Sequence, residues 1–216
     1  MSLRLVVLIS GSGSNLQAVL DACGQSSRAG AGMNARVVGV LSNKADAFGL
    51  ARATRAGVPT AVLDHTGYPD RESFDRAMAG VIDAWQPDVV VLAGFMRILS
   101  AGFVQHYAGR LLNIHPSLLP RYKGLHTHRR ALAAGDAEHG CSVHFVTPEL
   151  DGGPVIAQAV VRVEGTDNEE TLADRVHAAE HRLYPAVLGW LADQRLQYRD
   201  GQPWFDGHPL AQPVRL

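Results

Sequence analysis

Two polar residues at the end of an apolar run have the types and spacing needed to act on a carbonyl group. The run reads Leu111-Leu112-Asn113-Ile114-His115-Pro116, and in an extended strand residues i and i+2 point to the same face. Asn113 brings an amide N–H donor, and His115 brings a ring that titrates near neutrality. This pair suits a reaction in which a carbonyl oxygen gains negative charge while a proton changes hands. An ordinary strand end, with its polar residues satisfying a turn, is the alternative interpretation.

An aspartate in a glycine-flanked loop is a candidate partner for this histidine. Asp151 is followed by Gly152 and Gly153 within the loop at residues 147–154. A carboxylate in such a loop can swing against a histidine and favour its imidazolium form. A plain Asp-Gly turn would give the same pattern.

A third candidate site is a glycine-rich turn near the start of the chain, Ser10-Gly11-Ser12-Gly13-Ser14-Asn15. Glycines allow a tight turn, and a helix N-terminus offers unpaired N–H groups to an anion. Leu16 stands where a dinucleotide fingerprint needs glycine, and no Gly-Lys-Ser/Thr follows for a nucleoside triphosphate. The turn therefore predicts a monophosphate site, with an N-capped strand-to-helix turn as the alternative.

The elements that must position these residues alternate between strands and helices. Apolar runs joined by amphipathic segments are typical of a parallel sheet covered on both faces. Two later strands, joined by the Asp151 loop, are expected to be antiparallel. The sequence thus predicts an α/β fold with a mostly parallel twisted sheet, helices on both faces and an antiparallel pair near the C-terminal end. The expected strands are residues 4–9, 36–41, 60–63, 88–92, 111–114, 140–146 and 155–163, and the expected helices are 14–22, 45–56, 71–85, 101–107 and 169–190.

The bulk properties indicate one domain, residues 1–216, with a C-terminal tail at 192–216 that contains a small hairpin. The net charge of -1 argues against nucleic acid as a partner. Two cysteines without a secretory leader indicate a reduced, cytoplasmic setting, and the N-terminal apolar run is too short to span a membrane. A flexible loop is expected at residues 24–32.

The histidines raise the question of a metal site. The motif His177-Ala178-Ala179-Glu180-His181 matches the His-x-x-Glu-His pattern of a zinc peptidase class. No glutamate follows Glu180 to complete such a site, so we expect no metal. His144 is either a satisfied strand histidine or part of the site. The remaining histidines are given no role, namely His126 and His128, which lack a third ligand, and His65, His106, His139 and His208, which are expected in turns or at the surface.

Taken together, five motifs resemble the phosphoribosylglycinamide formyltransferase family over nearly the whole chain, which implies a Rossmann-like formyltransferase fold. They lie at residues 13–15, 92–99, 113–120, 124–128 and 151–154. The family transfers a formyl group from 10-formyltetrahydrofolate to the amine of glycinamide ribonucleotide, in purine synthesis. Lys123 departs from relatives that have proline there, which could alter the neighbouring loop.

The resemblance implies roles for individual residues. Asn113, His115 and Asp151 match the catalytic triad, in which Asn113 and His115 stabilise the tetrahedral intermediate and Asp151 keeps His115 charged. Gly13, Ser14, Asn15, His177 and Glu180 match positions that bind the ribonucleotide. The folate, a cosubstrate, is assigned to Arg71, Met96, Arg97, Ile98, Leu99, Asn113, Thr147, Pro148, Glu149, Leu150 and Asp151. Small-molecule substrates, no metal and a monomer or weak homodimer are expected.

Two other functions remain as alternatives. A formyltetrahydrofolate hydrolase would use water in place of the amine, but such enzymes usually carry an additional N-terminal domain, which we do not expect here. The related methionyl-tRNA formyltransferases carry a C-terminal RNA-binding domain, which we also do not expect. A non-catalytic folate- or nucleotide-binding protein would have a damaged triad, whereas all three residues are present.

Overall fold

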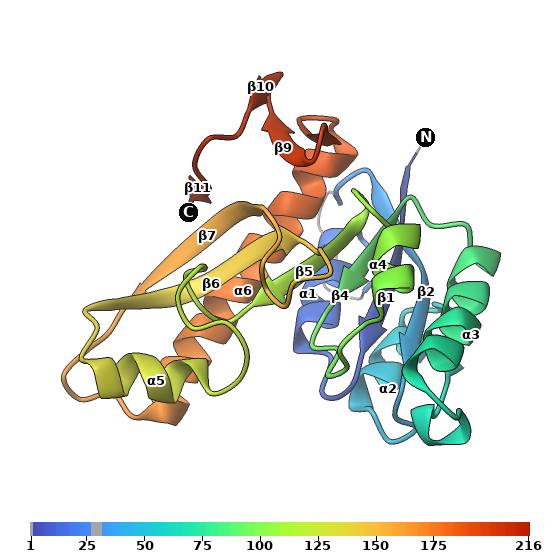
Figure 1. Ribbon diagram of the computed structural model, residues 1–216, viewed down its shortest axis with the longest axis horizontal. Helices are drawn as coiled ribbons and strands as arrows, with labels where there is room; N and C mark the ends of the chain where they lie inside the picture. Colours follow the sequence, from blue (N-terminus) through green and yellow to red (C-terminus); the bar gives the residue numbers. More distant parts are fainter. Residues whose placement is uncertain (1, 27–31) are drawn as a thin grey trace.

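An eight-stranded sheet organises the chain in this computed structural model, which describes residues 2–26 and 32–216. Residues 27–31, within the loop expected at 24–32, lie outside the described residues. The strand order is β11-β7-β6-β5-β4-β1-β2-β3 (Figure 1). The strands are β1 (Leu3–Ile9), β2 (Ala35–Ser42), β3 (Thr60–Val62), β4 (Val89–Leu92), β5 (Leu111–His115), β6 (Glu138–Phe145), β7 (Val155–Arg162) and β11 (Val214–Arg215).

Strand direction divides the sheet in two. The pairs β1–β2, β2–β3, β1–β4 and β4–β5 are parallel, whereas β6 is antiparallel to both β5 and β7. The mostly parallel sheet with an antiparallel pair toward the C-terminal end is as predicted. Since parallel strands end at one edge, the segments that follow β1, β4 and β5 meet there.

Helices cover both faces of the sheet and create two apolar cores. The helices are α1 (Ser14–Ala22), α2 (Phe48–Arg55), α3 (Arg71–Ala84), α4 (Ala101–His106), α5 (Thr127–Ala134) and α6 (Glu169–Ala192), with a short 3-10 turn at His65–Gly67. Successive side chains of β1 point into different cores. Val7 packs in the core formed with α1 and α6, and Val6 packs in the core formed with α3 and α4. Figure 1 shows α6 passing behind β6 and β7, and α6 belongs to a different core from α3 and α4.

Three elements differ from the prediction. Helix α2 begins at Phe48 rather than at 45, because the preceding residues form a turn and Gly49 donates its N–H to the Gly11 carbonyl at 3.0 Å. Helix α5 was not predicted, since only Thr127 and Ala131 of its residues are buried. The tail contains the predicted hairpin, β8 (Leu196–Arg199) with β9 (Gln202–Phe205), and adds β10 (His208–Pro209).

The tail also returns to the main sheet, where β11 pairs in parallel with β7. Within the described ranges, no helix is long and apolar enough to cross a membrane.

Candidate active site

The ends of β4 and β5 bring the first candidate residues together. Leu92 of β4 lies opposite Asn113 of β5 in the parallel register, so the segment after β4 runs beside His115. The Met96 N–H donates to Ser10 Oγ at 2.8 Å, which ties this segment to the turn after β1. The edge of the sheet predicted to carry the chemistry therefore gathers three chain segments.

Both ring nitrogens of His115 have neighbours. Nε2 lies 2.9 Å from the Tyr122 carbonyl, and because a carbonyl only accepts, Nε2 carries the hydrogen. Nδ1 faces Oδ2 of Asp151 at 3.4 Å, and both side chains are 8% exposed. With Nε2 already a donor, the Asp151 carboxylate is placed to accept a hydrogen from Nδ1.

The backbone fixes Asp151 in place. Its φ of 47° lies in the left-handed region, and the Gly124 N–H donates to Oδ2 at 2.9 Å. A turn from Glu149 to Gly152 holds the loop, and a Cβ on Gly153 would lie 1.8 Å from the Phe145 carbonyl oxygen. Glycine at 153 therefore allows the close approach that places the Asp151 carboxylate beside His115.

Asn113 contacts a second histidine across the antiparallel pair. His144 lies opposite Asn113 in the register of β5 and β6, and Asn113 Nδ2 is 3.2 Å from His144 Nε2. His144 Nδ1 lies 3.0 Å from the Phe145 carbonyl and so must donate to it. Burial, the largest effect, lowers the pKa of His144 below its ordinary value. His144 is therefore a neutral ring whose Nε2 accepts from Asn113.

The glycine-rich turn leads into α1 as the sequence predicted. Gly13 has a φ of 69°, and a Cβ there would lie 2.6 Å from the Cα of Gly49. The first N–H groups of α1, which begins at Ser14, have no partner within the helix. The turn can therefore present backbone donors to an anion.

The turn meets α6 through a buried polar pair. Asn15 Nδ2 donates to Glu180 Oε2 at 2.8 Å, and both residues are buried. Burial raises the pKa of the Glu180 carboxyl, although the hydrogen bond from Asn15 and the charges of His177 and His115 act in the opposite direction. Asn15 Oδ1 is buried without a partner among the described residues. An acceptor left free beside the anion turn is suited to a ligand N–H or O–H group.

The two residues of α6 that are predicted to bind the ribonucleotide, His177 and Glu180, lie in different surroundings. Glu180 points inward to Asn15, whereas His177, one turn earlier on α6, is exposed and lies 6.5 Å from the His128 ring. In the part of the chain that the structure describes, no group of three or more His, Cys, Asp or Glu side chains is arranged to hold a metal ion.

Three of the residues assigned to folate are exposed apolar side chains. Met96 and Ile98 are 70% and 59% exposed after β4, and Leu150 beside Asp151 is 53% exposed. Such exposed apolar side chains next to a polar cluster are typical of a ligand site. The Arg97 guanidinium lies over the Phe74 ring at 5.5 Å, in the first turn of α3, which begins at the exposed Arg71. Of the remaining predicted residues, Leu99 and Thr147 are half-buried, and Pro148 and Glu149 are exposed.

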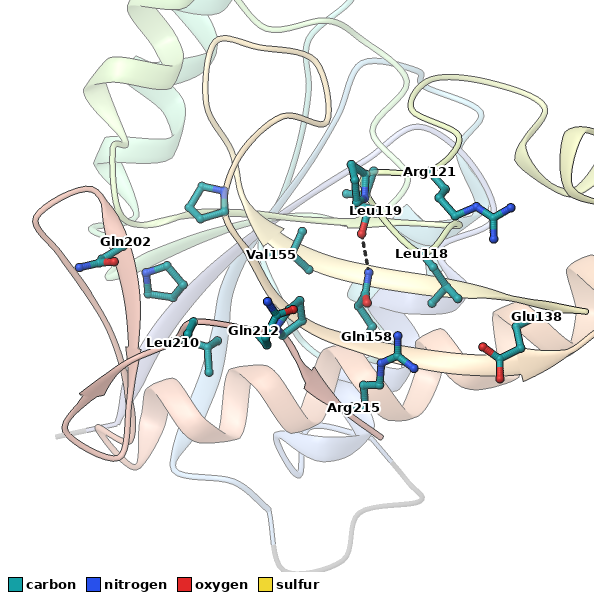
Figure 2. A pocket seen from close by; sticks show the side chains of 15 residues that line it. Leu118, Leu119, Arg121, Glu138, Val155, Gln158, Gln202, Leu210, Gln212 and Arg215 are labelled. Carbon is teal, nitrogen blue, oxygen red and sulfur yellow. Dashed lines mark hydrogen bonds between the residues drawn. The ribbon is translucent and has the colours of Figure 1, made fainter. Parts of the chain in front are cut away.

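A separate pocket of about 650 Å³ lies elsewhere, between the 118–121 turn, β7 and the C-terminal tail. Figure 2 shows Gln158 at its base, donating to the Leu119 carbonyl at 2.9 Å, with Arg215 from the tail nearby. None of the predicted site residues lines this pocket.

Sequence comparison identifies the family of a chain with this arrangement of residues. The pattern of the family described as formyl transferase matches residues 3–188. The chain belongs to this family. The formyl transferase chain is 58% identical over 208 residues to phosphoribosylglycinamide formyltransferase of Escherichia coli K12, covering 96% of each protein. The predicted resemblance is therefore confirmed.

Two further relatives support this assignment. The formyl transferase chain is 48% identical over 190 residues to the trifunctional purine biosynthetic protein adenosine-3 of Drosophila melanogaster, covering 88% of this chain and 14% of that protein. Phosphoribosylglycinamide formyltransferase of Coxiella burnetii, a solved structure, superposes with a TM-score of 0.93 at 49% identity and covers 100% of both chains. The Rossmann-like fold implied by the resemblance is thus confirmed.

The structure corrects one expectation and adds three contacts to the formyl transferase site. His139, expected in a turn or at the surface, lies in β6 and is 1% exposed, because antiparallel pairing extends the strand back to Glu138. The Tyr122 carbonyl and the Gly124 N–H could not be predicted from the sequence, since backbone groups leave no compositional signal. The role of His144 could not be decided from the sequence either, because its position opposite Asn113 depends on strand register.

Proposed function

We propose that this protein transfers the formyl group of 10-formyltetrahydrofolate to the amine of N1-(5-phospho-D-ribosyl)glycinamide. The observation that carries the proposal is the cluster of Asn113, His115 and Asp151 at the carboxyl edge of the sheet, with Nδ1 of His115 3.4 Å from Asp151. The cluster occurs in a chain 58% identical to an enzyme of that name.

Catalysis in this proposal begins with attack of the amine nitrogen on the formyl carbon. The carbonyl oxygen becomes an oxyanion, and the second Nδ2 hydrogen of Asn113 and the charged ring of His115 stabilise it. Loss of one such donor costs about 3–4 kcal/mol in well-studied enzymes. Asp151 favours the charge on His115 because its carboxylate lies beside Nδ1.

The intermediate then collapses, with the bond between the formyl carbon and the folate nitrogen breaking. The attacking nitrogen loses one proton and the departing folate nitrogen gains one, so the overall step is balanced. His115 Nδ1 is the titratable group aimed into the cluster, and it can pass this proton directly or through water.

Two neighbouring surfaces support the binding assignments. The exposed Met96, Ile98 and Leu150 side chains suit the flat ring system of a folate cosubstrate. The first N–H groups of α1 suit the ribonucleotide phosphate, and the free Oδ1 of Asn15 lies beside them. Arg71, Arg97, Leu99, Thr147, Pro148 and Glu149 complete the proposed folate site, and Gly13, Ser14, His177 and Glu180 complete the proposed ribonucleotide site.

We also propose a single formyltransferase domain at 1–216 that works in the cytoplasm as a monomer or weak homodimer without a nucleic-acid or membrane partner. The free cysteines Cys23 and Cys141 support the cytoplasmic setting, and the net charge of -1 supports the absence of a nucleic-acid partner.

The test is deformylation of 10-formyltetrahydrofolate followed by absorbance, with and without glycinamide ribonucleotide. We expect strict dependence on the ribonucleotide, and a fall in kcat of at least about 10³-fold in His115→Ala with folding retained. Folate release without the ribonucleotide would instead indicate the hydrolase. No reaction under either condition would indicate a binding protein, and near-normal turnover in His115→Ala would remove His115 from the mechanism.

A further inference from the structure

We propose that His144 is a positioning residue that aims the Asn113 amide at the reacting carbonyl. The inference rests on the proposed formyl transfer and adds a residue to its machinery. An amide side chain can turn by half a rotation and exchange its oxygen with its nitrogen, at little cost when both find partners. Stabilising an oxyanion requires the nitrogen to point into the cluster, so something must choose between the two orientations.

The orientation of the amide is fixed by hydrogen bonds that link three groups, namely the Phe145 carbonyl, the His144 ring and the Asn113 amide. The Phe145 carbonyl accepts from His144 Nδ1 at 3.0 Å, which leaves Nε2 without a hydrogen. Nε2 is then an acceptor, and it lies 3.2 Å from Asn113 Nδ2. The flipped amide would place Oδ1 against the Nε2 lone pair, so the backbone carbonyl of β6 fixes the orientation of an amide on β5.

The surroundings keep His144 in this role. The side chain is 2% exposed, and burial lowers its pKa below the ordinary value. A charged His144 would carry a hydrogen on Nε2, which would repel the Asn113 N–H groups and point toward Asp151 Oδ1, 3.9 Å away. That contact would compete with His115 for Asp151. A neutral His144 thus leaves Asp151 to His115 and the second Nδ2 hydrogen of Asn113 to the substrate.

The register of β5 against β6 explains why His144 can orient Asn113. Asn113 and His144 lie directly opposite each other in the β5–β6 ladder, and the ladder shifts register between Val143 and His144 on the other side of β6. The backbone of His144 is thus paired on both sides, and its 2% exposed ring has a contact at each nitrogen, which restricts its movement. A positioning group benefits from this rigidity, since a displacement of about 1 Å can cost about 100-fold in rate.

Two conservative variants separate positioning from packing. Glutamine places its amide oxygen near the position of Nε2, whereas asparagine is too short and reaches only the position of Nδ1. We expect His144→Gln to keep kcat within about fivefold, and His144→Asn to lower it about 10- to 100-fold, with both KM values within about twofold. Equal kcat values, or the reverse order, would overturn the inference.

A double-mutant cycle tests whether His144 acts through Asn113. The loss caused by His144→Asn should shrink to within about twofold in the Asn113→Ala background, because the group to be aimed is absent. Additive losses would overturn the inference. His139→Gln is the matched control, since His139 is another buried histidine of β6 but contacts His128 instead, and its effect should be additive with Asn113→Ala.

A third measurement is independent of turnover. Long-range ¹H–¹⁵N NMR spectra of the full chain, assigned with His144→Gln, report which ring nitrogen carries hydrogen. The Nδ1–H tautomer of His144 at neutral pH supports the inference, and an Nε2–H tautomer or a charged ring overturns it. A wild-type chain that transfers no formyl group would refute the proposed function and this inference together. A wild-type chain that transfers it, with additive variants, would refute this inference alone.

Discussion

A contact between buried His139 and half-buried His128 is expected to make the stability of this protein depend on pH. His139 Nε2 lies 3.1 Å from His128 Nδ1, with the two rings perpendicular at 5.2 Å. Burial is the largest effect and lowers the pKa of His139 from 6.5 to about 4, and it also lowers that of His128. The charge of His128 acts on His139 in the same direction, so the folded protein resists protonation of His139.

The pKa values set the sign and size of the effect. The folded pKa of His139 lies below the unfolded value, so the unfolded chain binds a proton first as the pH falls. The stabilisation is therefore complete above about pH 6.5 and is lost as the pH falls toward 4. At 1.36 kcal/mol per pKa unit, the full shift corresponds to about 3 kcal/mol. We expect about 2 kcal/mol, since solvent near the half-buried His128 ring weakens the effect.

The assay is urea unfolding of the wild type and His139→Gln at several pH values between about 7.5 and 4.5. Acidic side chains affect both proteins alike, so the difference between their unfolding free energies isolates the histidine. That difference should shift by about 2 kcal/mol in favour of the variant as the pH falls. His208→Gln, at an exposed histidine of β10, serves as the matched control. Parallel curves for wild type and His139→Gln would refute the reasoning.

Three further changes test the proposed site. Asn15→Leu should raise the ribonucleotide KM at least about tenfold and leave the folate KM within about twofold; equal rises would contradict the phosphate assignment. Gly153→Ala places a Cβ 1.8 Å from the Phe145 carbonyl oxygen, so the loop should move and kcat should fall about 10- to 100-fold; an unchanged kcat would show that the loop tolerates the change. Asp151→Asn keeps an acceptor for the Gly124 N–H but removes the charge, so kcat should fall about 10²- to 10⁴-fold with both KM values within about threefold; a kcat near that of the wild type would contradict its role.

The regular elements could be predicted because their residues carry periodic signals. Helix α1 (Ser14–Ala22) has the bounds expected from the sequence, since a glycine turn precedes it and apolar residues recur along one face. Helix α5 (Thr127–Ala134) lacked this signal, because it buries only two residues. The parallel pairing of β11 with β7 joins segments more than 50 residues apart, and two residues carry no periodic pattern.

The candidate site likewise has residues that the sequence indicates and contacts that only the fold creates. The sequence alone indicated Asn113 and His115, since alternation along one strand places them on one face. It also indicated Asp151, since two glycines follow it in a loop. The tertiary structure decided how their hydrogens are arranged. The Tyr122 carbonyl, the Gly124 N–H and the neutral ring of His144 reach the triad across loops and strands. Local sequence specifies which groups exist, but the register of β5 against β6 and the path of two loops determine which donor faces which acceptor.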